Sequence, residues 1–354
     1  MTQLYGKQYS KDELERMTGY MFQLAGIQLG ELTDGRARGM RVATVRTGSG
    51  FEFQVLLDRA MDIWLAEHAG RPLAWLHPAL GGPALYEPRG DGWARTFGGG
   101  LVTTCGLTHF GHPEVDQGEE LGLHGRISHC AASSCQVREG WQGDDYTLEL
   151  TGVTRQAVLF GEYLTLERTI STRLGANHLA IHDRVRNDGY RPTPHMILYH
   201  CNFGFPVVSP DSEVLLADEA VRPRDEDARA GVDRWHLFEA PQADFREQVF
   251  FHQPRVGADG MVRAAIVNRQ LGFGAFIRYR AAELPCLAQW KMMGARDYVC
   301  ALEPANYWET PRHVLREEGR LRFLQPGEEV DYYLEIGALT SAEEVQAFER
   351  EIGE

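Results

Sequence analysis

The chain lacks the short motifs of several large enzyme classes. Its 354 residues contain no G-x-G-x-x-G after a strand pattern, no G-x-x-x-x-G-K-[S/T] phosphate loop, no G-x-S-x-G elbow and no H-E-x-x-H pair. These patterns serve to cradle phosphates, to expose a nucleophilic serine or to bind zinc. Nucleotide-dependent chemistry and serine hydrolysis therefore lose support.

Cysteine is scarce, and long apolar runs are missing. The six cysteines form no C-x-x-C pair and no zinc-binding spacing; they are Cys105, Cys130, Cys135, Cys201, Cys286 and Cys300. We expect free, mostly buried thiols in a reducing compartment. No stretch approaches the length of a membrane span, and the polar segment 1–17 lacks the apolar centre of a signal peptide. The expectation is a cytoplasmic protein that does not bind membranes.

Basic residues are outnumbered by acidic ones. The chain has 36 Lys and Arg against 50 Asp and Glu, which gives a formal net charge of −14. Nucleic-acid binding depends on Lys and Arg that neutralise phosphates, so this balance disfavours a nucleic-acid partner. A neutral or weakly charged small molecule is compatible with it. The 43% apolar and 24% charged content is ordinary for a globular protein.

Alternating apolar residues indicate β-strands over most of the chain. Such runs start at Phe51, Tyr146, Leu164, Leu179, Phe273 and Tyr332. Capping boxes at 10–13 and 341–344 predict short helices near the two ends, the second with an apolar stripe of Val345, Phe348 and Ile352. No strand-helix-strand rhythm appears, which argues against a parallel α/β sheet. We expect an all-β chain with a few short helices, forming a single domain over residues 1–354.

Two segments have the composition of long loops. Segment 81–100 is rich in glycine, and segment 217–231 is acidic with alternating charges. Long loops in compact proteins are often functional, so both are candidates to border a site.

His200 stands at the predicted end of a strand. It follows the apolar run 196–199 and precedes Asn202 and a glycine. The ordinary pKa of histidine lies near neutrality, so His200 is suited to donate a proton. The structural alternative is a core histidine bonded to a backbone carbonyl.

Glu303 has a similar setting, after the apolar run 299–302. A carboxylate at the end of a buried strand is partly desolvated, which raises its pKa and makes it a better base. The alternative is a structural ion pair with Arg126 or Lys291.

Three further histidines are candidates. His124 is followed by Gly125 and Arg126, where glycine permits the close approach of a ligand and arginine can grip a hydroxyl or a carboxylate. His109 and His112 stand three residues apart, a spacing compatible with one arm of a metal site. Ordinary loop histidines would give the same patterns.

Charged residues also interrupt two apolar segments. In 57–63, Arg59 or Asp62 could reach a site or pair with each other, and Asp58 is predicted to form a structural pair. Trp290 and Lys291 place an aromatic ring beside a cation, as sugars require for their C–H faces and hydroxyls. The alternative is a core tryptophan, with the lysine extending to water.

Four segments, taken in their order along the chain, resemble the galactose mutarotase-like superfamily (aldose 1-epimerases), in particular its DUF4432 branch. They are Leu57-Asp58-Arg59-Ala60-Met61-Asp62-Ile63, Leu123-His124-Gly125-Arg126-Ile127-Ser128, His200-Cys201-Asn202-Phe203-Gly204 and Leu302-Glu303-Pro304. The resemblance implies an antiparallel β-supersandwich with a wide groove for sugars.

The same resemblance implies catalytic roles. His124 would help to hold the sugar, His200 would protonate the ring oxygen, and Glu303 would remove the proton of the anomeric hydroxyl. The aspartate that grips sugar hydroxyls in typical mutarotases has no match here. The side chains expected to bind the substrate in its place are Arg59, Asp62, Arg126, Asn202, Trp290 and Lys291.

The resulting hypothesis is an aldose 1-epimerase that acts on a small sugar by acid–base ring opening and needs no cofactor. One alternative is a metal-dependent sugar isomerase or lyase, with a divalent ion held by His109, His124, His200 and Glu303. Another is a non-catalytic carbohydrate-binding protein. The oligomeric state is open, with a homodimer among the options.

Overall fold

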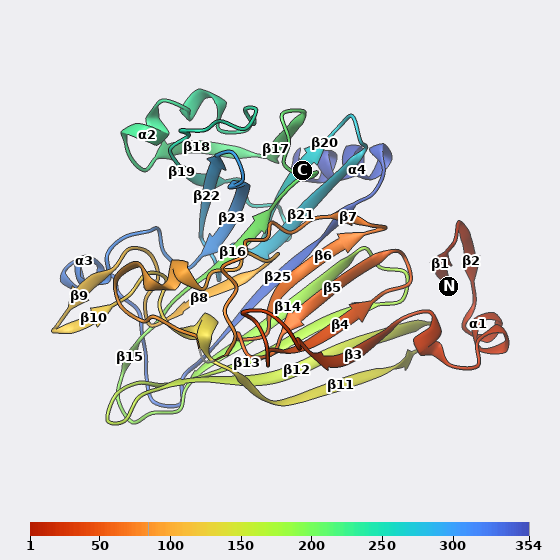
Figure 1. Ribbon diagram of the computed structural model, residues 1–354, viewed down its shortest axis with the longest axis horizontal. Coiled ribbons are helices and arrows are strands. Elements are labelled where there is room, and N and C mark those ends of the chain that lie inside the picture. The colour runs from red at the N-terminus through yellow and green to blue at the C-terminus, as the bar shows by residue number, and fades with distance from the viewer. Residues whose placement is uncertain (84, 354) are drawn as a thin grey trace.

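The computed structural model describes residues 1–83 and 85–353, which fold into three large antiparallel sheets with short helices at their margins (Figure 1). The order of the eight-stranded sheet is β11 (Ala132–Gln142), β12 (Asp145–Ala157), β13 (Tyr163–Arg173), β14 (His178–Asn187), β25 (Glu329–Leu339), β21 (Phe273–Arg280), β20 (Met261–Asn268) and β17 (Ser212–Leu216). The order of the five-stranded sheet is β3 (Gly26–Glu31), β4 (Arg41–Arg46), β5 (Phe51–Leu56), β6 (Asp62–His68) and β7 (Arg71–Pro72).

The six-stranded sheet is the one that carries the candidate site. Its order is β18 (Asp218–Pro223), β19 (Gln248–Pro254), β22 (Cys286–Met293), β23 (Tyr298–Ala305), β16 (Met196–Phe203) and β8 (Thr103–Leu107). Strands far apart in sequence thus become neighbours, since β16 lies between β23 and β8.

Smaller elements complete the chain. Three two-stranded ribbons pair β1 (Thr2–Leu4) with β2 (Lys7–Tyr9), β9 (Glu114–Asp116) with β10 (Glu119–Leu121), and β15 (Thr193–Pro194) with β24 (Phe323–Leu324). The helices are α1 (Lys11–Met17), α2 (Glu226–Arg229), α3 (Arg312–Glu317) and α4 (Ala342–Gly353), with 3-10 turns η1 (Met21–Gln23), η2 (Gly90–Arg95), η3 (Ile127–His129) and η4 (Val232–Arg234). In Figure 1, α1 lies at one end of the molecule, and α3 with β9 and β10 lies at the other.

The alternation of apolar residues has the predicted consequence. All six predicted runs are strands, and along β12 buried positions alternate with less buried ones. One large core cluster contains Val55 of β5, Leu166 of β13 and Cys201 of β16, so it joins the three large sheets. Burial of this apolar surface, at about 25 cal/mol per Å², is the main force that holds the sheets together.

Both predicted capping boxes start helices. Ser10 accepts a hydrogen bond from the backbone N–H of Glu13, whose carboxylate returns to the backbone N–H of Ser10, at the start of α1. At α4, Ser341 accepts from the N–H of Glu344, and that carboxylate bonds to Thr340. The predicted apolar stripe of α4 packs on the large sheet through Val345 and Phe348.

The prediction of a long loop is wrong in part for segment 217–231. Segment 217–231 contains β18 and α2, because its alternating residues pair with β19 as an edge strand, which tolerates charge. Segment 81–100 is mostly irregular around η2, and Ala84 lies outside the described residues. No helix among the described residues is both long and apolar enough to cross a lipid bilayer.

Candidate active site

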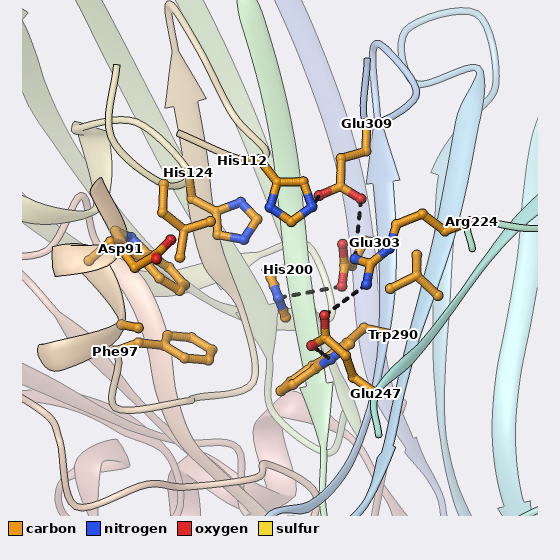
Figure 2. Close-up of a pocket in the computed structure, with 14 residues that line it drawn as sticks. Asp91, Phe97, His112, His124, His200, Arg224, Glu247, Trp290, Glu303 and Glu309 are labelled. Carbon is orange, nitrogen blue, oxygen red and sulfur yellow. Dashed lines mark hydrogen bonds and ion pairs between the residues drawn. The ribbon is translucent and has the colours of Figure 1, made fainter. Parts of the chain in front are cut away.

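A cavity of about 320 Å³ lies on one face of the six-stranded sheet (Figure 2). Its lining comes from β16, β19, β22 and β23, from η2, and from the segments around residues 112, 124, 224, 247 and 309. The lining residues are Asp91, Trp93, Ala94, Phe97, His112, Leu123, His124, His200, Arg224, Glu247, Val249, Trp290, Glu303 and Glu309. All three side chains predicted to be catalytic, those of His124, His200 and Glu303, are among them.

His200 and Glu303 face each other within the cavity. They lie on neighbouring antiparallel strands, next to the Cys201–Leu302 pair in the register, so their side chains share one face of the sheet. The distance from His200 Nε2 to Glu303 Oε1 is 3.4 Å, and both side chains are more than nine-tenths buried. A proton can therefore pass between an acid and a base that the backbone ladder holds in place.

Burial sets the protonation of this pair. It lowers the pKa of His200 to about 4, because the imidazolium is poorly solvated there. Burial, together with repulsion from Glu309 and Glu247, raises the pKa of the Glu303 carboxyl well above its usual range. Both shifts favour the neutral form of the pair, with its proton on Glu303, over the ion pair.

His124 forms a third side of the site. Its ring meets that of His200 edge-on, with 5.7 Å between centroids, and loss of water lowers its pKa well below the ordinary value. Gly125 explains the local backbone, because its φ is +75° and a Cβ atom would lie 2.3 Å from the carbonyl oxygen of His109. The predicted His-Gly segment thus fixes the position of the His124 ring.

Aromatic rings surround the reactive pair. Trp93 and Phe97 stack with centroids 4.4 Å apart, Phe97 lies 5.4 Å from the His200 ring, and Trp290 approaches His200 edge-on at 5.5 Å. Such apolar faces suit the C–H surfaces of a sugar. Within the described chain, the Nδ1 atoms of His200 and His124 are buried without a hydrogen-bond partner, and buried polar atoms are normally satisfied. The unsatisfied nitrogens favour a ligand with polar groups, and the rings suit apolar C–H faces on the same ligand.

The opposite wall is charged. Arg224 contacts Glu247 at 2.8 Å and Glu309 at 3.6 Å (Figure 2). It also contacts the neighbouring Asp225 at 2.9 Å. Glu247 also accepts a hydrogen bond from Trp290 Nε1 at 2.9 Å. These contacts join the chain after β18, the chain before β19, β22 and the segment after β23 into one wall.

Several predicted substrate-binding residues do not line the cavity. Lys291 is fully buried on the other face of β22 and pairs with Glu239 at 2.8 Å, because successive strand residues point to opposite faces. Asn202 donates to the carbonyl oxygens of Gly100 and His200, so it supports the strand that carries His200.

The other charged candidates also have structural partners. Arg126 pairs with Glu119 at 3.4 Å near the surface. Arg59 is buried against His129, with 3.1 Å between their nitrogens, and burial lowers its pKa to about 10. Asp58 pairs with Arg41, as predicted for it. Six residues, all within the described chain, were predicted to bind the substrate. Of these, Trp290 alone lines the cavity.

Asp62 belongs to a buried polar network in the core. Arg168 contacts Asp62 at 3.2 Å and Asp183 at 2.6 Å, and Asp183 also accepts from the hydroxyl of Tyr199. Asp62 further accepts from the backbone and hydroxyl of Thr104. The network links β6, β8, β13, β14 and β16, so the 57–63 segment holds the sheets together.

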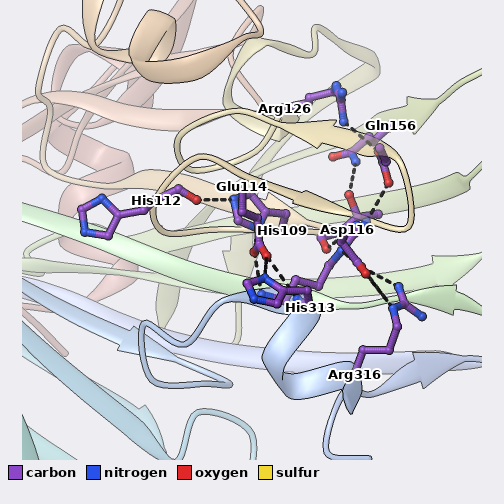
Figure 3. Close-up of polar contacts among 11 residues, drawn as sticks. His109, His112, Glu114, Asp116, Arg126, Gln156, His313 and Arg316 are labelled. Atoms are coloured by element: carbon purple, nitrogen blue, oxygen red, sulfur yellow. Dashed lines mark hydrogen bonds and ion pairs between the residues drawn. The ribbon is translucent and has the colours of Figure 1, made fainter. Parts of the chain in front are cut away.

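His109 belongs to a second polar network (Figure 3), and it lines a second cavity that shares His112 and Glu309 with the first. Its Nε2 lies 3.1 Å from the carbonyl oxygen of His112, and its Nδ1 lies 3.3 Å from Glu114. Glu114 in turn binds the ring and the backbone N–H of His313 at the start of α3. This network fixes the segment from which His112 reaches Glu309, with 3.4 Å between their polar atoms.

The four ligands of the metal-dependent alternative are therefore not gathered. His109 lines a separate cavity from the one that contains His124, His200 and Glu303. Across residues 1–83 and 85–353, no three His, Cys, Asp or Glu side chains form a group that could hold a metal ion.

Sequence reasoning missed the charged wall. Arg224 lies in segment 217–231, which was expected to be a loop near a site but without a named residue, and no role was predicted for Glu247 or Glu309. The composition of 81–100 gave a usable signal, since a long loop was expected there and Asp91, Trp93 and Phe97 line the cavity.

The sequence profile of the family DUF4432, a domain of unknown function, matches residues 37–338. The chain belongs to this family. No curated protein matches the sequence of this DUF4432 chain.

Solved structures resemble the DUF4432 chain over most of its length. A Klebsiella pneumoniae protein, provisionally described as an aldose 1-epimerase, is 26% identical with a TM-score of 0.88, over 94% of this chain and 90% of that one. A galactose mutarotase-like protein from Clostridium acetobutylicum is 13% identical with a TM-score of 0.59, over 89% and 99%. Galactose 1-epimerase from Lactobacillus acidophilus is 13% identical with a TM-score of 0.55, over 89% and 98%. The fold is thus the galactose mutarotase-like fold.

Proposed function

We propose that this protein is an aldose 1-epimerase, which interconverts the two anomers of a sugar by opening and closing its ring. The observation that carries the proposal is the pair of His200 and Glu303, an acid and a base 3.4 Å apart inside a cavity of monosaccharide size. The similarity to the Klebsiella pneumoniae protein gives it further support.

The geometry suits the chemistry of an anomeric carbon. The anomeric hydroxyl oxygen and the ring oxygen are both bonded to C1, so a base and an acid that serve them must lie close together. Glu303 removes the proton from the anomeric hydroxyl while His200 gives a proton to the ring oxygen. The C1–ring-oxygen bond breaks, the open aldehyde rotates about C1–C2, and the reverse transfers close the ring on either face.

Proton balance needs no exchange with solvent. One proton transfer within the resting pair gives protonated His200 and ionised Glu303, and ring opening then returns the pair to neutral His200 and protonated Glu303. These two forms differ by one proton transfer within the pair, and burial stabilises the second form. Ring closure restores the first form. An acid or base in such a position typically contributes about 10²- to 10⁴-fold in rate.

The remaining lining residues have roles that follow from their chemistry. His124, with an unpartnered ring nitrogen beside His200, would bond a sugar hydroxyl. Trp290, Trp93 and Phe97 would pack against the C–H face of the ring. No step of this mechanism requires a cofactor.

The test measures anomer exchange directly. Purified protein is added to a panel of common aldoses at anomeric equilibrium, and the exchange rate between anomers is measured by NMR. We expect acceleration for at least one aldose and its loss in Glu303→Gln. An exchange rate equal to that of buffer for every sugar, with binding retained in Glu303→Gln, would instead identify a carbohydrate-binding protein.

A further inference from the structure

The mouth of the cavity is acidic. Glu309, Glu247 and Asp91 line it from different segments, and Figure 2 shows Asp91 across the cavity from the two glutamates. The side chains of Glu309 and Glu247 are 18% and 47% exposed, so their carboxylates are accessible at the opening. Charges of one sign around a concave site concentrate the field inside it.

One cation lies among these groups, and it is already engaged. Arg224 is held by Asp225, Glu247 and Glu309, and these contacts raise its pKa further above the ordinary value. Its single positive charge is thus outnumbered by these three carboxylates. The lining holds three carboxylates besides Glu303 and one guanidinium, so the mouth carries a net negative charge.

A second observation shows that this acidic wall belongs to a ligand site. His200, in the same cavity, is more than nine-tenths buried, and within the described residues its Nδ1 atom has no hydrogen-bond partner. A polar ligand that reaches His200 must pass, and then lie beside, the carboxylates of Glu247 and Glu309. Glu247 and Glu309 therefore interact with the charge of the ligand while His200 interacts with its hydroxyls.

We infer that the carboxylates around the mouth, those of Glu247, Glu309 and Asp91, determine specificity by charge. The site takes sugars that bear a protonated amino group in preference to neutral sugars, and rejects sugars that bear a phosphate or a carboxylate. This inference rests on the proposed function for its ligand class, a monosaccharide, and adds the charge of the substrate. Because both glutamates are partly solvated, each contributes about a two- to fivefold preference at low salt, and added salt weakens it.

The test is a binding series of sugars matched in size and different in charge. Dissociation constants are measured by ligand-observed NMR for glucosamine, glucose, N-acetylglucosamine, glucuronate and glucose 6-phosphate, and for the galactose equivalents, at slightly acidic pH. N-Acetylglucosamine keeps the substituent at C2 but removes its charge. We expect the amino sugar to bind tightest and the two anions weakest, with the spread narrowing as salt is added.

Two variants test the wall itself. Glu247→Gln and Glu309→Gln each remove one carboxylate, and we expect each to lower the ratio of amino-sugar to neutral-sugar affinity by about two- to fivefold. Glu15 lies on α1, and its ion-pair partner among the described residues is Lys11 at 4.0 Å. Glu15→Gln therefore makes the same charge change elsewhere and should leave the ratio unchanged. Thermal melting verifies that each variant is folded.

The results separate this inference from the proposed function. An amino sugar preferred over its neutral partner, without accelerated anomer exchange, would support charge selection and remove the epimerase. Accelerated anomer exchange, with anionic sugars bound as tightly as neutral ones, would support the epimerase and contradict charge selection. The inference is also overturned if neither glutamate variant changes the affinity ratio, or if no sugar of the series binds.

Discussion

Nε2 of His200 lies 3.4 Å from Oε1 of Glu303, across two neighbouring antiparallel strands. If this pair shares one proton during the reaction, its two members act as a unit. We expect His200→Gln and Glu303→Gln each to lower kcat for anomer exchange by about 10²- to 10⁴-fold, and the double variant to lose no more than the worse single one. Rates are measured by exchange NMR. If the fold-decrease in kcat of the double variant equals the product of the two single decreases, the two groups act separately.

The pH profile of kcat/KM should be bell-shaped. Below a pH of about 4, the pKa of His200, the pair takes up a second proton, and the base is lost. Above the raised pKa of Glu303, the pair loses its remaining proton, and the acid is lost. The plateau should lie between these two pKa values. A rate that rises steadily from acid to alkaline pH would contradict a shared proton.

Gly125 is expected to be essential for the position of His124. In Gly125→Ala, the new Cβ would lie 2.3 Å from the carbonyl oxygen of His109, at a φ of +75°. The loop must move, so kcat/KM should fall and the melting temperature should drop. Gly118→Ala is the matched control, since Gly118 has a φ of +83° but no atom within 4 Å of such a Cβ. Equal losses in both variants would mean that backbone strain alone is responsible.

Replacing Arg168, the cation of the buried core network, should lower the free energy of unfolding. Arg168→Met leaves Asp62 and Asp183 without their partner, and an uncompensated buried charge costs about 3–5 kcal/mol of unfolding free energy. Arg173→Met, on the same strand but with its side chain 54% exposed, should change it by less than about 0.5 kcal/mol. Chemical denaturation measures both. A small effect in Arg168→Met would show that the core adapts by protonating an aspartate.

Stability should fall as the pH falls below about 6.5. Four histidines, three of them buried and His129 half-buried, have lowered pKa values in the folded protein, to about 4 or about 2; the other three are His109, His195 and His200. As the pH falls, these rings take up protons in the unfolded chain before they do so in the folded protein. Each ring therefore lowers the free energy of unfolding by about 1.4 kcal/mol per pH unit, until the pH reaches its pKa in the folded protein. Asp62 and Glu303 have raised pKa values, so their protonation increases the free energy of unfolding as the pH falls. These two carboxyl groups are outnumbered by the four histidines. Equal unfolding free energies at pH 7 and pH 5 would contradict this.

The sequence predicted the strands and helices well, because their signals are local. Alternation along a strand and a Ser–Glu capping box depend only on residues a few positions apart. The convergence of His124, His200 and Glu303 on one cavity was also anticipated, through the resemblance to a family rather than through any local pattern.

The misplaced and missed residues share a physical cause. Trp290 and Lys291 were both expected at the site, although adjacent residues of a strand cannot face the same side. Arg224 and Glu247 reach the cavity only because β18 and β19 join β22 at the sheet edge, an order that no local pattern encodes. For Arg59 and Asp62, the composition of the segment cannot distinguish a charge at a site from a charge paired in the core.

The reactive pair and the charged wall come from different kinds of structure. His200 and Glu303 are fixed by the hydrogen-bond ladder of two central strands, whereas Asp91, Arg224, Glu247 and Glu309 lie outside regular strands. Exchanging those peripheral segments between relatives should therefore alter which sugar is accepted while leaving the chemistry intact. The scaffold offers protein engineers a fixed reaction centre with a replaceable entrance.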